Sequence, residues 1–186
     1  MKNPIDQIMD WAHHLENHEP VSWERMPEID LYMDQVITYM DKRLDLYRRN
    51  EQAKLLTPSM INNYVKEELI PRPEQKKYAR DHLAGLMMIC MLKQVLSIPD
   101  IKDILKNLRQ NADMSEIYDK FITAQDVALK KVGLRTEQVC ALRDDDQLRQ
   151  LAMDLTLEAN ACRITAERIL SALEHPVNEA ETATVK

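Results

Sequence analysis

Glycine is almost absent from this sequence, since only Gly85 and Gly133 occur in 186 residues. Average usage would give about a dozen. Glycine supplies the positive-φ positions of tight hairpins and phosphate-binding loops. Its scarcity therefore argues against a large β-sheet, and neither GxGxxG nor GxxxxGK(S/T) occurs in the sequence. The composition favours helices and gives no indication of a nucleotide-binding loop.

Cysteine is also sparse and widely spaced, at positions 90, 140 and 162, with no CxxC pair. Three isolated cysteines are typical of a protein from a reducing compartment. No signal peptide precedes the first predicted helix, and charges interrupt every apolar run well before about 18 residues. We therefore expect a cytoplasmic protein that does not enter a membrane.

Residue patterns for catalysis or metal binding are lacking as well. His14 and His18 lie four residues apart, a spacing that can hold zinc on a helix, but no third strong ligand is evident and HExxH is absent. Neither a Ser/His/Asp nor a Cys/His arrangement is recognisable. We therefore expect no enzymatic activity, no cofactor and no bound metal.

Charge is distributed unevenly along the chain. Residues 42–80 contain ten Lys or Arg against five Asp or Glu, a local net charge of +5 in a chain whose formal net charge is −6. A basic segment in an acidic protein suits one local contact with phosphates. The alternative is an ordinary solvated helix surface.

Apolar periodicity predicts an all-α fold: a helix-turn-helix core with at most a small β wing, followed by a C-terminal helical hairpin. Helices are expected over 4–18, 30–48, 58–68, 81–96, 98 to about 108, 114–132, 136–142 and 145–174. Asp113 is the expected N-cap of the 114–132 helix, and Gly133 is its expected stop. The predicted domains are an N-terminal helix and linker (1–29), the core (30–110), a helical region (111–175) and a disordered tail (176–186).

The most informative segment runs from Leu56 to Pro73. Thr57 is a strong N-cap with Pro58 at the first helical position. Pro71 and Pro73 stop the helix and force an extended passage. A basic segment follows at residues 76–80, and a tiny hairpin or loop is expected at residues 74–78. A polar helix beside a basic loop on an apolar frame is how a winged helix-turn-helix meets DNA.

The last helix carries a regular apolar seam with small residues in its middle. Its members alternate in steps of four and three, which is the heptad rhythm: Leu148, Ala152, Leu155, Ala159, Cys162, Ala166, Ile169 and Leu173. The partner of this seam is either the 114–132 helix of the same chain or the same helix of a second chain. Because two-fold regulators span two half-sites, a homodimer is the favoured expectation.

The order of these elements resembles MerR-type winged-helix regulators. Their recognition helix ends in Tyr-x-x-x-Gly-Leu-hydrophobic-Pro, which is similar to Tyr64 to Pro71 here, and a wing with Arg and Tyr follows. A later helix opens with a Ser-hydrophobic-x-Glu-Ile turn, similar to Ser97 to Ile101. The resemblance covers about residues 30–108. The chain also looks like a family found mainly in Gram-positive bacteria, described only as a domain of unknown function with a MerR-like core.

The resemblance implies a set of DNA contacts on the recognition helix and wing. This chain has Asn62 and Asn63 where those proteins usually carry Arg and Tyr, and Glu68 where they have Gly. Asn can read adenine edges in the major groove. The predicted DNA-binding residues are Thr57, Ser59, Asn62, Asn63, Tyr64, Lys66, Arg72, Lys76, Lys77, Tyr78 and Arg80.

Two functions follow from the sequence. The first is a transcriptional regulator that binds double-stranded DNA, with an effector, an operator and a sign of regulation that the sequence does not give. The second is a helical protein-interaction module whose winged-helix core does not bind DNA. The methionine-rich segment 87–91 either lines a ligand pocket or is simply core.

Overall fold

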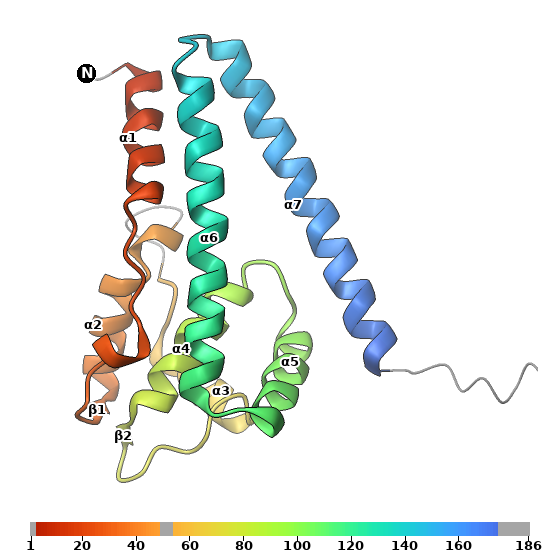
Figure 1. The fold of residues 1–186 in the computed structure, drawn as a ribbon. Coiled ribbons are helices and arrows are strands. Elements are labelled where there is room, and N and C mark those ends of the chain that lie inside the picture. The colour runs from red at the N-terminus through yellow and green to blue at the C-terminus, as the bar shows by residue number, and fades with distance from the viewer. Residues whose placement is uncertain (1–2, 49–53, 175–186) are drawn as a thin grey trace, which may run out of the picture.

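The computed structural model of the chain describes residues 3–48 and 54–174. Within these residues the chain forms seven α-helices and one two-stranded antiparallel sheet (Figure 1), which confirms the predicted all-α class with a small wing. The α-helices are α1 (Pro4–Glu16), α2 (Met33–Arg43), α3 (Pro58–Lys66), α4 (Arg80–Leu92), α5 (Ile98–Asn111), α6 (Met114–Cys140) and α7 (Asp145–Glu174). Single 3₁₀ turns are η1 (Trp23–Arg25) and η2 (Asp45–Tyr47).

Local capping signals fix the starts of α3 and α5 where the sequence predicts them. The Thr57 hydroxyl accepts a hydrogen bond from the Met60 N–H at 3.3 Å. The Ser97 hydroxyl accepts from the Asp100 N–H at 3.3 Å and donates to the Asp100 carboxylate at 2.6 Å. Each cap satisfies a backbone donor that the first helical turn leaves without a partner.

The sheet joins two segments that are far apart in sequence. Strand β1 (Leu31–Tyr32) pairs with β2 (Lys77–Tyr78), so that Leu31 faces Tyr78 and Tyr32 faces Lys77. The prediction of a helix from residue 30 is therefore wrong by three residues, because β1 occupies 31–32 and α2 starts at Met33. A tight turn at residues 74–77 feeds β2, where a hairpin or loop was expected.

The hydrophobic core gathers around α4, as its apolar sequence predicts. The ten residues from His82 to Met91 are all buried, since neighbours cover the helix on several sides. Partners come from α2, α3, α5 and the first turns of α6, where Ile117, Tyr118 and Ile122 are buried. We call residues 31–111, from β1 to α5, the winged-helix core.

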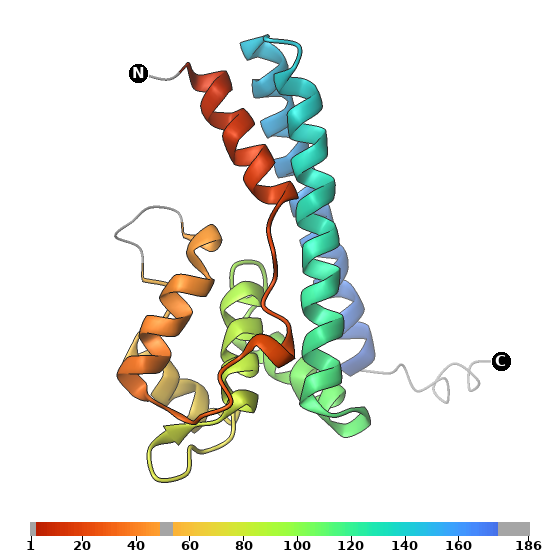
Figure 2. The ribbon, with the colours of Figure 1, turned by 60° about the vertical axis from the view of Figure 1, so that its left-hand side comes forward.

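The remaining helices form an arm beside that core. In Figure 2, α1 crosses against the upper part of α6, and α7 returns from the far end. We call α1, α6 and α7 the helical arm. Helix α6 is one continuous helix, so the predicted stop at Gly133 and the separate 136–142 helix are wrong. Its N-cap Asp113 makes no side-chain capping hydrogen bond, contrary to the predicted cap.

Gly133 lies in α6 for a tertiary reason. A Cβ atom built there would be 3.1 Å from each of the Ala12 carbonyl oxygen, Leu15 Cβ and Glu16 Cγ of α1. The absent side chain therefore lets the two helices approach closely. Glycine at this position serves helix packing and does not end the helix.

Helix α7 forms a hairpin with α6 and then separates from it. Leu151 is buried near the turn, and Arg135 of α6 lies 2.8 Å from Glu158 of α7. Figure 1 shows α7 diverging from α6 beyond this region. Ile169 and Leu173 of the predicted seam are 54% and 73% exposed. The seam thus has no partner over its second half among the described residues.

The predicted boundary at residue 110 stays a prediction, although the buried residues of α6 belong to the same core as α2–α5. The predicted disordered tail at 176–186 lies outside the described residues. No helix in the described ranges combines the length and the apolar character that crossing a membrane requires.

Candidate nucleic-acid interface

One face of α3 is polar and exposed, and the opposite face is anchored in the core. Ile61 is fully buried and Tyr64 is 6% exposed. Turned outward are the side chains predicted to meet DNA, namely Ser59, Asn62, Asn63 and Lys66. The rotation of the helix therefore agrees with the sequence prediction, and a surface of amides, hydroxyl and ammonium is free for contact.

The C-terminus of α3 is closed by a Schellman motif. The Leu69 N–H donates to the Tyr64 carbonyl at 2.9 Å, and the Glu68 N–H donates to the Val65 carbonyl at 3.2 Å. This geometry puts Glu68 in the left-handed region, with φ 60°. Glycine is the residue that usually occupies this position. Leu69 and Ile70 then turn inward and are both 1% exposed.

The extended segment 71–78, which we call the wing, carries the next cations. Arg72 and Lys76 are exposed, and Lys77 lies 5.6 Å from the centre of the Tyr32 ring across the sheet. The tip is a tight turn with positive φ at both Gln75 and Lys76, closed by the Lys77 N–H to the Glu74 carbonyl at 2.8 Å. The turn projects Lys76 outward.

Three predicted contact residues have other roles. Tyr64 and Tyr78 are 6% and 3% exposed, so they support the surface from below, and burial raises the pKa of Tyr64 to about 12. The Arg80 guanidinium stacks 5.5 Å from the Trp23 ring centre and donates to the Met26 carbonyl at 3.4 Å. Direct DNA contact by these three side chains is therefore not supported, because each is occupied within the fold.

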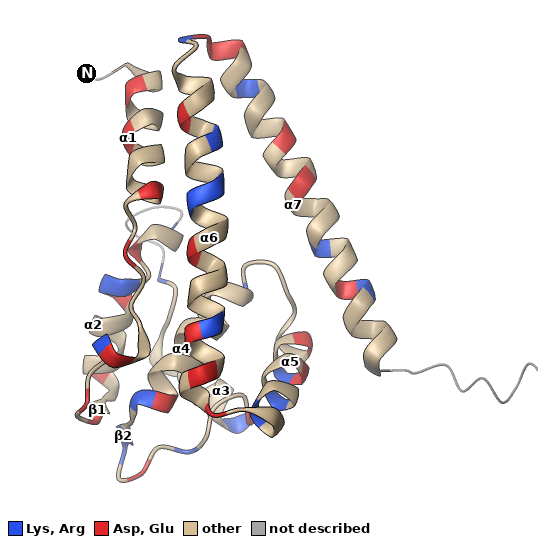
Figure 3. Ribbon diagram, in the orientation of Figure 1, with Lys and Arg blue, Asp and Glu red and all other residues tan. Residues whose placement is uncertain are grey.

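The remaining predicted residues come together on one side of the core. Thr57 is half-buried and caps α3, and Ser59 lies about two turns before Lys66 at the other end of the helix. Figure 3 shows cationic stretches on the loop that leads into β2. Acidic side chains are interspersed, since Glu67, Glu68 and Glu74 are all exposed. Of the predicted contact residues, only Arg80 takes part in a described ion pair, 3.8 Å from Glu28.

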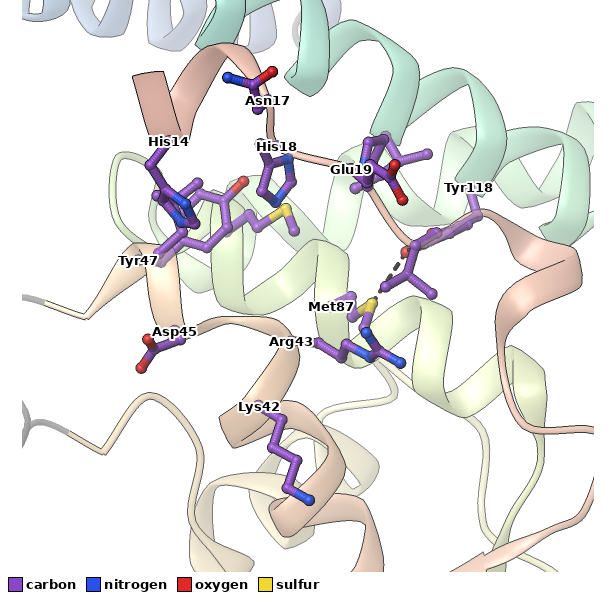
Figure 4. A pocket seen from close by; sticks show the side chains of 15 residues that line it. His14, Asn17, His18, Glu19, Lys42, Arg43, Asp45, Tyr47, Met87 and Tyr118 are labelled. Atoms are coloured by element: carbon purple, nitrogen blue, oxygen red, sulfur yellow. Dashed lines mark hydrogen bonds between the residues drawn. The ribbon is translucent and has the colours of Figure 1, made fainter. Parts of the chain in front are cut away.

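A separate pocket of about 320 Å³ lies where the helical arm meets the core (Figure 4). Met87 and Met91 of α4 line it together with Tyr118 of α6. The Tyr118 hydroxyl lies 2.8 Å from the Val21 carbonyl, to which it donates, and 3.0 Å from the Met87 sulfur. The methionine-rich segment 87–91 is therefore part of the hydrophobic core and also lines a pocket, the two roles that the sequence left open.

Polar groups around this pocket are incompletely paired. The Tyr47 hydroxyl and His18 Nδ1 are buried without a hydrogen-bond partner. His18 Nδ1 lies 3.9 Å from the Asp126 carboxylate, which is too far for a hydrogen bond. Burial lowers the pKa of His18, and the nearby Asp126 opposes that shift. A small polar molecule or water would satisfy these atoms.

The described residues thus form an all-α fold with a small wing and an added helical arm, and α3 exposes a polar face. The chain belongs to the family described as a domain of unknown function, DUF1836, whose model matches residues 21–121. That match ends next to Ile122, the last residue of the hydrophobic core cluster, and it excludes α1 and α7. Neither a curated protein nor a solved structure gave a match to the chain.

Two features of the site escaped the sequence prediction. Tyr32 is 51% exposed beside Lys77, but the chain between them spans the whole helix-turn-helix, so only the strand pairing brings them together. The pocket at the junction likewise depends on α1, α2, α4 and α6 meeting in space. The only local indication of a role for Tyr32 is its position, since it is an exposed aromatic residue just before a helix with a polar start.

Proposed function

We propose that the protein is a transcriptional regulator that binds duplex DNA through α3 and the wing, as MerR-like proteins do. The observation that carries this proposal is the exposed row Ser59, Asn62, Asn63 and Lys66 on a helix anchored by its opposite face. Asparagine amides suit the paired donor and acceptor on adenine in the major groove.

The wing supplies the sequence-independent part of the contact. Arg72, Lys76 and Lys77 follow α3 in the chain, and none of them takes part in an ion pair among the described residues. Lys77 also lies against the Tyr32 ring, but a cation without an acidic partner is available to neutralise phosphates and release counterions. These cations position the protein, while the asparagines specify sequence.

We also propose that a second copy of the chain covers the seam of α7. Beyond Leu155 the seam is exposed except at the half-buried Ala166, and exposed apolar surface of this kind marks an interaction site. Small residues at Ala159 and Cys162 permit close approach of another helix. A two-fold dimer would present two α3 helices to two half-sites.

The other candidate is a protein-interaction module without DNA binding. It is favoured by a specific observation: α7 also exposes apolar side chains on the face opposite the seam, where Met153, Leu157 and Ile164 are 52–62% exposed. Glu67 and Glu68 at the end of α3 would repel phosphates. Under this reading the winged-helix core is a scaffold for the arm.

A charge-removal experiment separates the two candidates. Lys76→Ala combined with Lys77→Ala is compared with Lys130→Ala combined with Lys131→Ala, an adjacent lysine pair on α6 away from the wing. Both double variants lose the same charge. We expect the wing variant to bind random duplex more weakly and to lower the salt slope by roughly one unit per lost phosphate contact.

The control variant should retain the affinity and slope of the unchanged protein. If both double variants lose the same affinity, binding depends only on the net charge of the protein, and the wing is not part of a DNA interface. No binding by any form at low salt would favour the protein-interaction module.

A further inference from the structure

A group of cations that shares Lys66 and Arg72 with the candidate DNA surface lies between α3, α5 and the start of α6. Two adjoining cavities of about 540 and 340 Å³ share Arg109 and Glu68 in their linings. Lys66 and Arg72 line the larger cavity. Lys102 and Lys106 of α5 line the smaller one. The lining of the smaller cavity is therefore net cationic, whereas Glu68, Asp81 and Asp113 balance the three basic residues that line the larger one.

Arg109 is unusual because its charge is partly buried without compensation. Its Nε and Nη2 atoms are buried and have no hydrogen-bond partner. Burying a charge is costly unless the charge is paired and hydrogen-bonded. Desolvation lowers the pKa of Arg109, and the nearby Asp81 is the opposing influence. No described ion pair within 4 Å joins the two residues.

The fold makes room for this guanidinium. A Cβ atom at Gly85 of α4 would lie 3.4 Å from Arg109 Nη2 and 3.1 Å from Ile70 Cγ2. One of the two glycines in the chain thus stands where the Arg109 side chain crosses α4. An arginine that packs this closely against the core is held in a fixed position, and its planar fork suits carboxylate and phosphate groups.

The start of α6 adds to the same electrostatic environment. Ala112, Asp113 and Met114 line the larger cavity, and the Asp113 side chain makes no capping hydrogen bond. The first N–H groups of this long helix are therefore not satisfied by a side-chain cap. A helix N-terminus favours negative charge, and here it opens toward a cavity that already holds an unpaired guanidinium.

We propose that these cavities form a binding site for a small anion that carries phosphate or carboxylate groups, with Arg109 as its central contact. The anion supplies the counter-charge that the protein does not. Lys66 and Arg72 close one side, and Lys102 and Lys106 close the other. The carboxylates of Glu68, Asp81 and Asp113 in the lining of the larger cavity disfavour anions that do not reach Arg109. A duplex backbone is too bulky for these cavities, so the ligand is a small molecule.

Calorimetric titration with inorganic phosphate and, separately, with citrate tests this site, using chloride at matched ionic strength as reference. We expect saturable binding of at least one of the two, and the stronger one identifies phosphate or carboxylate chemistry. Arg109→Met should weaken it by roughly tenfold or more, as expected for loss of a charge-assisted hydrogen bond. Arg135→Met, which removes an arginine from the α6–α7 contact, should leave it unchanged.

Asp81→Asn keeps the proposal testable if Arg109→Met fails to fold. Removing this carboxylate removes a competitor, so anion binding should tighten. The opposing account is that Asp81 itself neutralises Arg109 in solution. Absence of saturable binding in the unchanged protein, together with a loss of stability in Asp81→Asn, would overturn the proposal. Because the titration contains no DNA, its outcome is independent of the proposed regulator function.

Discussion

Glu68 provides a sharp test of the backbone conformation at the end of α3. Its φ of 60° lies in the left-handed region, which is imposed by the Schellman motif that closes α3. A residue with a Cβ atom pays about 1–2 kcal/mol for this conformation. Glycine has no such penalty, so Glu68→Gly should relieve the strain without disturbing the two motif hydrogen bonds.

The magnitude follows from three contributions. Relief of the left-handed strain favours the variant by about 1–2 kcal/mol. Removal of a negative charge near a helix C-terminus adds about 0.3–1 kcal/mol. The greater freedom of glycine in the unfolded chain opposes these by about 0.5–1 kcal/mol. Glu68→Gly is therefore expected to raise the free energy of unfolding by roughly 1 kcal/mol, or the midpoint temperature by about 2–4 °C.

Two control variants isolate the conformational contribution in urea and thermal denaturation. Glu68→Ala removes the charge but keeps the strain, so it should gain only a few tenths of a kcal/mol. Glu67→Gly changes a neighbour with an ordinary φ of −82°, so it relieves no strain. Its flexibility cost of about 0.5–1 kcal/mol is offset by the same charge gain of about 0.3–1 kcal/mol, and its stability should stay close to that of the unchanged protein. If Glu68→Gly is no more stable than Glu68→Ala, residue 68 does not adopt the left-handed conformation in solution.

Four further predictions concern the interface, the arm and the pocket. Asn63→Ala should fold normally and change base preference at one position by about 1–3 kcal/mol in a binding-site selection; unfolding would mean that the residue is buried. In sedimentation, Ala159→Glu should convert a dimer into a folded monomer, whereas Leu157→Glu on the opposite face of α7 should leave the dimer intact. If the protein without substitutions is already a monomer, the proposed dimer is refuted. Gly133→Val should lower the free energy of unfolding by about 1–3 kcal/mol, because α1 packs against that backbone, and an unaffected stability would contradict the close approach. Burial lowers the pKa of His18, so the folded state favours the neutral imidazole, and the free energy of unfolding should fall as the pH drops below 6.5. His18→Gln should reduce this pH dependence. An equal pH dependence in both proteins would exclude His18 as its source.

Features that depend on neighbouring residues were predictable from the sequence. Thr57 and Ser97 start their helices through hydrogen bonds to residues three positions on, and such caps are encoded locally. The apolar run of α4 likewise predicted burial on all sides. The exposed side of α3 followed from helical periodicity alone, which correctly assigned Asn62 and Asn63 to the surface.

Features that depend on distant segments were not predictable. Gly133 has the sequence signature of a helix end, but its reason is the α1 backbone more than 100 residues earlier in the chain. Arg80 was expected to meet phosphates, yet Trp23 and Met26 engage it. The cavity around Arg109 is assembled from α3, α5 and the start of α6, so no single stretch of sequence indicates it.

The most direct test of the central claim is the salt dependence of the affinity of the unchanged protein for a random duplex. Lys66, Arg72, Lys76 and Lys77 are the cations available to phosphates on α3 and the wing. Their number predicts that log K falls linearly with log salt, with a slope of roughly −3 to −4 for one protomer and about twice that for a dimer. A slope near zero, or no binding at low salt and tens of micromolar protein, would contradict the claim that this surface binds DNA.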